Sequence, residues 1–315
     1  MAFRHELRIF WAILTTSVSI GLAQSAPSRD QHEIPPWTLE LEQRLQPWCP
    51  ADCVTIIPFT ATYRKSGHVL VFVGAHHLFT PQNSTLRAVD SGFAAAAPAI
   101  VILEGFPTAM GENPPPLVEE ARRRGTPETD DYAKGEAMYA ASLALARGIP
   151  FIGGEPTREE QTQTLMHESF SPGDLFFVQL LGDLSQAFRA GDFASGSDPK
   201  LRKVYKFWSE ATARDFKLAP MSFEDFSARY RVVYGVDITR DTNLVQHAEA
   251  STSNPTAPLM RATGVIRDEH LLATIENELA LKKRVLVVYG GSHWTTLSRA
   301  LQKRLGKPTI APFPE

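Results

Sequence analysis

Four short apolar runs along the chain have the length and the β-branched content of buried strands. They are Val69–Val73, Ala99–Leu103, Ile149–Ile152 and Val285–Tyr289. The segments between them carry apolar residues at three- and four-residue spacing, which is typical of helices with one buried face. Strands that alternate with helices pair in parallel, because each connection must cross over the sheet. The pattern therefore predicts an α/β fold, with a mostly parallel sheet flanked by helices.

The middle of the chain shows the helical pattern alone, over about residues 158–250. The helices expected there are Leu175–Phe188, Lys200–Phe216 and Phe223–Tyr234. Arg267–Lys283 is a further amphipathic helix, and it leads into the last apolar run. Residues 106–116 are rich in proline and glycine, and we expect no regular structure there. The sequence thus predicts a single α/β domain over residues 61–315 with a helical insertion.

The N-terminus has the pattern of a secretory signal peptide. Arg4 and Arg8 precede the apolar stretch Ile9–Leu22, and small residues occupy the expected cleavage position. We expect residues 1–23 to be removed and the protein to be secreted or periplasmic; an uncleaved N-terminal anchor is the alternative. No later segment approaches eighteen continuous apolar residues, so we expect no stable membrane span in the mature chain.

Residues 24–60 form a proline-rich, polar lead-in that carries both cysteines of the chain, Cys49 and Cys53. A pair with this spacing and no further cysteine is a poor zinc site, and no thioredoxin-like pattern accompanies it. In an oxidising compartment we therefore expect a structural disulfide between the two residues.

Composition and motifs exclude several classes of function. The chain has 43% hydrophobic and 21% charged residues, which is ordinary for a soluble globular protein. A formal net charge of −3 gives no electrostatic footprint for nucleic acid, so we expect no such partner. No predicted strand leads into a glycine-rich dinucleotide or phosphate loop, and the G-x-S-x-G motif of serine hydrolases is absent.

The predicted strands end at histidines and glutamates. The motif GAHH places His76 and His77 after the first run, and Glu104 and Glu155 follow the second and third runs. A second G-x-x-H motif places His293 after the last run. Because the carboxyl ends of parallel strands lie along one edge of a sheet, these side chains should converge on one site.

A cluster of imidazole and carboxylate groups suits two kinds of chemistry. His77, His293 and Glu104, with His76 as a weaker fourth, could ligate Mn²⁺, Co²⁺ or Zn²⁺, which lower the pKa of a bound water. Alternatively, a histidine is a general base without metal, held in one tautomer by a glutamate. Each residue taken singly also has a structural explanation, since glutamates, for example, favour helix N-termini.

The motifs GAHH, VILEG, GGEP and RDEHLLATI…KRVLVVYGGSHW resemble those of the TraB/TIKI/ChaN/erythromycin-esterase superfamily. The resemblance extends over about residues 65–300, although the helical middle is similar in layout alone. It implies functional roles for the two histidines of the G-x-x-H motifs, the acids at the strand ends and the arginine that opens the helix before the last strand. In this chain these residues are His77, His293, Glu104, Glu155 and Arg267.

The resemblance implies hydrolysis of an ester or peptide bond in a small molecule or peptide. The TIKI branch contains metal-dependent proteases, and the erythromycin esterases use a histidine to activate water. ChaN binds haem, so a binding protein for haem or another metal-bearing ligand is the alternative, and an inactive member is a third. The second histidine of GAHH and the ending GSHW depart from the TraB/TIKI pattern, which leaves the substrate open.

Overall fold

The structure is a computed structural model that describes residues 58–77, 83–126, 135–168, 170–241, 244–247 and 254–314. The predicted signal peptide and the predicted Cys49–Cys53 disulfide lie outside the described residues. The elements in chain order are β1 (Phe59–Lys65), β2 (His68–Ala75), α3 (Ser84–Ala96), β3 (Ile100–Pro107), the 3-10 helix η3 (Thr108–Met110), α4 (Pro115–Arg124), α5 (Glu136–Ala146), β4 (Phe151–Glu155), α6 (Arg158–His167), α7 (Pro172–Arg189), α8 (Lys200–Phe216), α9 (Phe223–Tyr234), α10 (Leu244–His247), α11 (Ala257–Lys282), β5 (Arg284–Gly290), α12 (Gly291–Leu305) and β6 (Thr309–Pro312).

The strands of the described residues form one six-stranded sheet in the order β4-β3-β5-β2-β1-β6. β3 pairs in parallel with β4 and β5, and β5 pairs in parallel with β2. β1 is antiparallel to both of its neighbours, β2 and β6. The predicted α/β fold with a mostly parallel sheet is thus confirmed, and the four expected strands form its parallel part.

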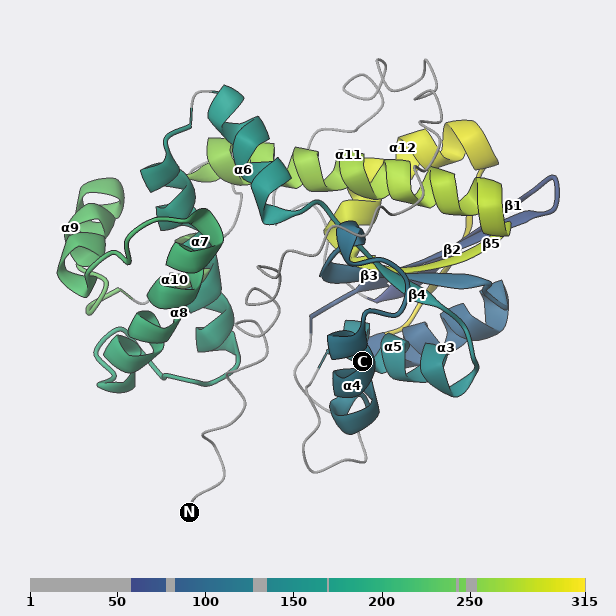
Figure 1. The fold of residues 1–315 in the computed structure, drawn as a ribbon, viewed down its shortest axis with the longest axis horizontal. Helices are drawn as coiled ribbons and strands as arrows, with labels where there is room; N and C mark the ends of the chain where they lie inside the picture. The colour runs from purple at the N-terminus through teal and green to yellow at the C-terminus, as the bar shows by residue number, and fades with distance from the viewer. Residues whose placement is uncertain are drawn as a thin grey trace, which may run out of the picture.

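Helices cover both faces of this sheet (Figure 1). Leu70 and Phe72 of β2 pack in one core with residues of α11 and α12. Val71 and Val73, which alternate with them along the strand, pack in a second core with residues of α3, α4 and α5. Successive side chains of a strand point to opposite faces of the sheet. A strand that is buried on both faces therefore has apolar residues at successive positions, which explains the continuous apolar runs in the sequence.

The helices α6 to α10 form the predicted insertion, and most of them lie beside the sheet (Figure 1). They have a separate, aromatic-rich core in which, for example, the ring centroids of Phe177 and Phe226 lie 5.1 Å apart. The long helix α11 joins the two regions, because it contacts α6 and α7 as well as β4 and β5. The predicted helix Arg267–Lys283 corresponds to the later part of α11.

The structure corrects two expectations from the sequence. Residues 106–116 are not without regular structure: β3 extends to Pro107, η3 follows it, and α4 begins at Pro115. Both prolines are in positions that tolerate a missing N–H, one at an irregularity of the strand pairing and one at a helix start. In addition, the pattern of the sequence does not predict the strands β1 and β6, which extend the sheet beyond β2.

Candidate active site

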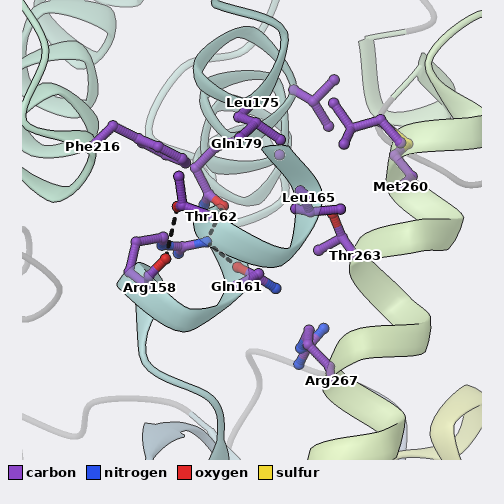
Figure 2. Close-up of a pocket in the computed structure, with 13 residues that line it drawn as sticks. Arg158, Gln161, Thr162, Leu165, Leu175, Gln179, Phe216, Met260, Thr263 and Arg267 are labelled. Carbon is purple, nitrogen blue, oxygen red and sulfur yellow. Dashed lines mark hydrogen bonds between the residues drawn. The ribbon is translucent and has the colours of Figure 1, made fainter. Parts of the chain in front are cut away.

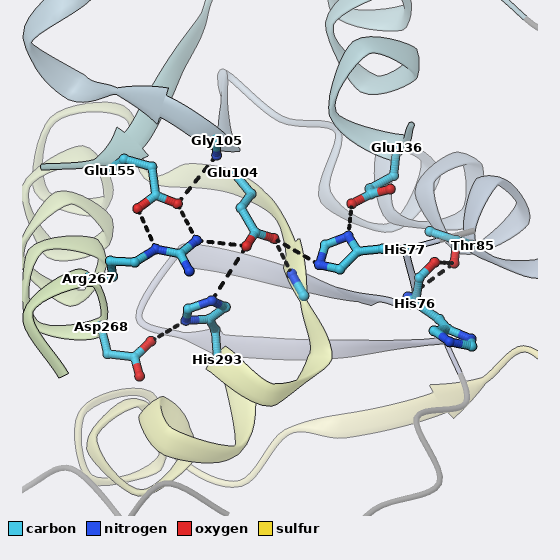
Figure 3. A network of polar contacts seen from close by, with 11 residues as sticks. His76, His77, Thr85, Glu104, Gly105, Glu136, Glu155, Arg267, Asp268 and His293 are labelled. Atoms are coloured by element: carbon cyan, nitrogen blue, oxygen red, sulfur yellow. Dashed lines mark hydrogen bonds and ion pairs between the residues drawn. The ribbon is translucent and has the colours of Figure 1, made fainter. Parts of the chain in front are cut away.

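The five residues predicted for the site meet at the carboxyl edge of the parallel strands (Figure 3). His77 follows the end of β2, Glu104 lies in β3, and Glu155 is the last residue of β4. His293 lies in the first turn of α12, directly after β5, and Arg267 comes from α11. The local reason is the parallel pairing, which brings the ends of these strands to the same edge of the sheet.

Glu104 is the centre of the network. One carboxylate oxygen, Oε1, accepts a hydrogen bond from Nη2 of Arg267 at 2.8 Å, and Oε2 accepts one from the backbone N–H of Gly290 at 2.6 Å. Nε2 of His77 lies 3.7 Å from Oε2, and Nε2 of His293 lies 3.5 Å from Oε1. Burial opposes ionisation, but the surrounding positive groups hold the pKa of Glu104 well below its usual value.

His77 is paired with a residue that the sequence pattern did not predict. Its Nδ1 lies 2.6 Å from Oε1 of Glu136, a buried glutamate at the first position of α5. The attraction of Glu136, although burial opposes it, raises the pKa of His77 to about 9. The His77 side chain is 40% exposed and that of Arg267 is 26% exposed, so His77 is more accessible to solvent than Arg267.

His293 is held in the same way but in the interior. Its Nδ1 lies 2.5 Å from Oδ1 of Asp268, and both side chains are buried. Burial alone would lower the pKa of His293, but the carboxylate of Asp268 outweighs it and raises the pKa to about 9. The other oxygen of Asp268, Oδ2, is buried without a hydrogen-bond partner among the described residues.

Arg267 bridges the two strand-end glutamates. Its Nε and Nη2 donate to the two oxygens of Glu155 at 2.7 and 2.6 Å, while Nη2 also donates to Glu104. The backbone N–H of Gly105 donates to Oε1 of Glu155 at 3.3 Å. Burial opposes ionisation of Glu155, but Arg267 lowers the pKa of that carboxyl below its usual value. A two-point contact of this kind fixes the plane of the guanidinium as well as its position.

His76 does not join the network. Its backbone N–H and C=O are both hydrogen-bonded to the hydroxyl of Thr85, at 3.1 and 2.7 Å. Its ring is exposed and points away from Glu104 (Figure 3). The adjacent histidines of GAHH therefore have different environments, and His77 is the one that faces the site.

The described residues offer one group of three side chains that could hold a metal ion: His77, Glu104 and Glu136. Their ligand atoms all lie within 4.8 Å of one another. This group shares His77 and Glu104 with the set predicted from the sequence, but Glu136 stands in the place predicted for His293. One nitrogen and two carboxylate oxygens form a donor set that suits Mn²⁺, Co²⁺ or Zn²⁺.

Asp268 and Glu136, which were not predicted as site residues, differ in whether the sequence gave a signal for them. Asp268 is adjacent to Arg267 in the motif RDEH, so an acid next to a candidate site residue was a usable signal. Glu136 gave none, because it begins a helix that follows no predicted strand and reaches His77 through tertiary packing alone.

The chain matches no model of a known protein family, no curated protein and no solved structure. The family resemblance of its motifs therefore stays a prediction. Within the part of the chain that the structure describes, no helix combines the length and the apolar character needed to cross a membrane.

Proposed function

We propose that this chain is a hydrolase of ester or peptide bonds and that His77 is its proton-transfer group. The observation that carries the proposal is the pairing of His77 with Glu136 through Nδ1, while Nε2 of the same ring lies 3.7 Å from Glu104 and has no hydrogen bond among the described residues. An imidazole that is oriented by a carboxylate at one nitrogen and open at the other is the arrangement used in general acid–base catalysis.

The neighbouring residues have complementary roles in this proposal. Glu136 keeps a proton on Nδ1 of His77, so that the ring, once neutral, accepts a proton from water at Nε2. Because the pKa of His77 is raised to about 9, the neutral ring is the minority form at pH 7, and kcat/KM should rise as the pH approaches 9. The oxygen of that water then attacks the carbonyl carbon, and the imidazolium returns the proton to the leaving group. Arg267, held in place by Glu155, supplies positive charge for the oxyanion that forms on the carbonyl oxygen.

A divalent metal ion fits the same residues. His77, Glu104 and Glu136 would hold it, and a bound transition-metal ion lowers the pKa of a water ligand towards neutrality. A histidine must be neutral to bind a metal ion, and the pKa of His77 is raised to about 9. Metal binding would therefore compete with a proton over the whole neutral pH range.

The first test removes the pair. We expect His77→Gln and Glu136→Gln each to lower kcat/KM by about a hundredfold or more on a panel of ester and peptide substrates, because general acid–base catalysis contributes roughly 10²–10⁴-fold. His76→Gln is the matched control, since its ring is exposed next to His77 and lies outside the network. Thermal unfolding should show all three variants folded.

Two outcomes would count against the proposal. Equal activity of the His77→Gln variant and the wild type would remove His77 from the mechanism. A Soret band in the purified protein, together with no turnover on any substrate, would favour the haem-binding alternative.

The second test decides whether a metal ion takes part. If it does, exhaustive chelation abolishes activity and one divalent cation restores it. The affinity of the metal-free protein for Zn²⁺ or Mn²⁺, measured by calorimetry, should rise by up to about tenfold per pH unit between pH 7 and 9, because one proton leaves His77 on binding. Full activity after chelation, with no metal found by elemental analysis, would leave the metal-free histidine mechanism.

A further inference from the structure

A cavity opens beside the network, in the helical insertion. It has a volume of about 230 Å³ and lies between α6, α7 and α11, with Phe216 of α8 at its side (Figure 2). Pockets that hold a whole drug-sized ligand measure roughly 300–1,000 Å³. The cavity therefore has the size for one group of a substrate, with the rest of the molecule outside it.

Most of the wall is apolar. Leu165, Leu175 and Leu259, which line the cavity, are buried and form a small cluster of their own, against which Val178 and Phe216 pack. These side chains come from four different helices, so the apolar wall depends on how the insertion folds. A wall of this kind favours a branched aliphatic or aromatic group, because binding removes its apolar surface from water.

One wall of the cavity carries the guanidinium of Arg158. Nη1 of Arg158 donates to Oε1 of Gln161 and to Oε1 of Gln179, both at 2.8 Å. Among the described residues, no carboxylate is hydrogen-bonded to this half-buried guanidinium. Burial raises the pKa of the nearby Asp183, and the charge of Arg158 opposes this rise. The hydrogen bonds that Asp183 accepts come from Gln179 and Thr212. Guanidinium groups form their strongest hydrogen bonds with carboxylates, so Arg158 is suited to an anionic ligand.

The cavity reaches the network through Arg267. Thr263 and Arg267 both line it, and because they are four residues apart they lie on the same side of α11 (Figure 2). The hydrogen bonds of Arg267 to Glu104 and Glu155 use Nε and Nη2. Among the described residues, no hydrogen bond uses its Nη1. A group bound in the cavity would therefore end next to the guanidinium that adjoins the proposed reaction centre.

We propose that this cavity binds the end of the substrate, and that this end consists of an apolar group of about the size of a leucine side chain together with a carboxylate held by Arg158. The inference rests on the proposed function, since it names the substrate class of that site. Two kinds of molecule share this chemistry: a peptide with an apolar carboxyl-terminal residue and a short acyl chain with a free carboxylate.

Binding of non-hydrolysable probes tests the inference without any turnover. In calorimetry on the full chain, N-acetyl-L-leucine should bind at least about tenfold more tightly than N-acetyl-L-leucinamide, since hydrogen bonds between ionised partners are roughly twice as strong as those between neutral ones. It should also bind more tightly than N-acetylglycine, which lacks the apolar group. The acyl probe is 4-methylpentanoate, which has the carbon skeleton of leucine without the amide group. Whichever of 4-methylpentanoate and N-acetyl-L-leucine binds more tightly identifies the source.

Two variants locate the binding. Arg158→Gln should abolish the preference for the acid over the amide, whereas Met260→Trp should fill the cavity and weaken binding of every probe while the charge remains. Arg202→Gln is the matched control, because Arg202 lies in the neighbouring helix α8 outside the cavity and pairs with Glu224. Its probe affinities should equal those of the wild type.

Equal affinity for acid and amide, or an unchanged preference in Arg158→Gln, would overturn the inference. So would failure of all probes to bind. If His77→Gln abolished hydrolysis in the same preparations, the proposed function would stand and only the assignment of this cavity would fall.

Discussion

At the scale of single residues, the two G-x-x-H motifs use their glycines for different reasons. A Cβ on Gly74 would lie 2.2 Å from the ring of Phe59, which packs against Trp294. A Cβ on Gly290 would instead lie 3.0 Å from Nε2 of His77 and 3.4 Å from Oε2 of Glu104. The first glycine makes room for the core, and the second leaves space beside the proposed reacting nitrogen.

Alanine at Gly74 should therefore lower stability, whereas alanine at Gly290 should lower activity. We expect Gly74→Ala to lower the free energy of unfolding by about 1–3 kcal/mol, because overpacking forces the Phe59 ring to move. Gly290→Ala should leave stability within about 1 kcal/mol, since φ at Gly290 is −52°, which an L residue adopts freely. Its kcat/KM should fall about tenfold or more, because the methyl group occupies the space next to His77.

Urea unfolding and substrate kinetics on both variants check this pair of expectations. If Gly290→Ala kept full activity, the space beside Nε2 of His77 would not be where water or substrate binds. If Gly74→Ala were as stable as the wild type, the contact with Phe59 would not be the reason for that glycine.

At the scale of secondary-structure elements, burial decides what the sequence could predict. Apolar side chains of β2, β3, β4 and β5 pack on both faces of the sheet. The resulting continuous apolar runs allowed these strands to be predicted from the sequence. β6 is exposed along its whole length, so no apolar pattern marks it. β1 mixes threonines with Ala61 and Tyr63, and it ends in exposed charged residues, which gave too weak a pattern.

The same reasoning explains which site residues were found. His77 and His293 follow strands, and Glu104 and Glu155 lie in the carboxyl-terminal parts of theirs. Parallel pairing brings such positions together at one edge of the sheet. The carboxylates that fix the two histidines come from helices, and where a helix lies against a sheet depends on packing between residues distant in sequence. The strand ends therefore predicted the members of the site, but not which acid holds which ring.

At the scale of the whole molecule, α11 connects the two regions and presents the site between them. Its early part lines the cavity with Leu259, Met260 and Thr263, and its later part packs on the sheet through Leu271 and Ile275. Arg267 and Asp268 lie between these parts, where one contacts Glu104 and the other His293. A shift of α11 against the sheet would therefore change the cavity and the contacts of Arg267 and Asp268 with the strand ends together.

The charge network should also make the stability of the metal-free protein depend on pH. The pKa of His293 is raised from 6.5 to about 9 in the folded state, so the folded state holds this proton more tightly than the unfolded chain. The stabilisation is complete below pH 6.5 and is lost as the pH rises through 9. For this buried ring the loss is about 3 kcal/mol as an upper value, and His77, which is partly exposed, adds less.

Asp268→Asn isolates this effect, because it removes the carboxylate that raises the pKa of His293 and leaves burial, which lowers it. Urea unfolding in the presence of a chelator should show that the free energy of unfolding of the wild type falls between pH 6.5 and 9, and that the fall is clearly smaller in Asp268→Asn. The buried Asp183, with a pKa of about 6, titrates below this window. Burial raises the pKa of Tyr63 to about 12, which lies above it. An equal fall in both proteins would show that His293 is neutral in the folded state, and the charge assigned to the interior of the network would be wrong.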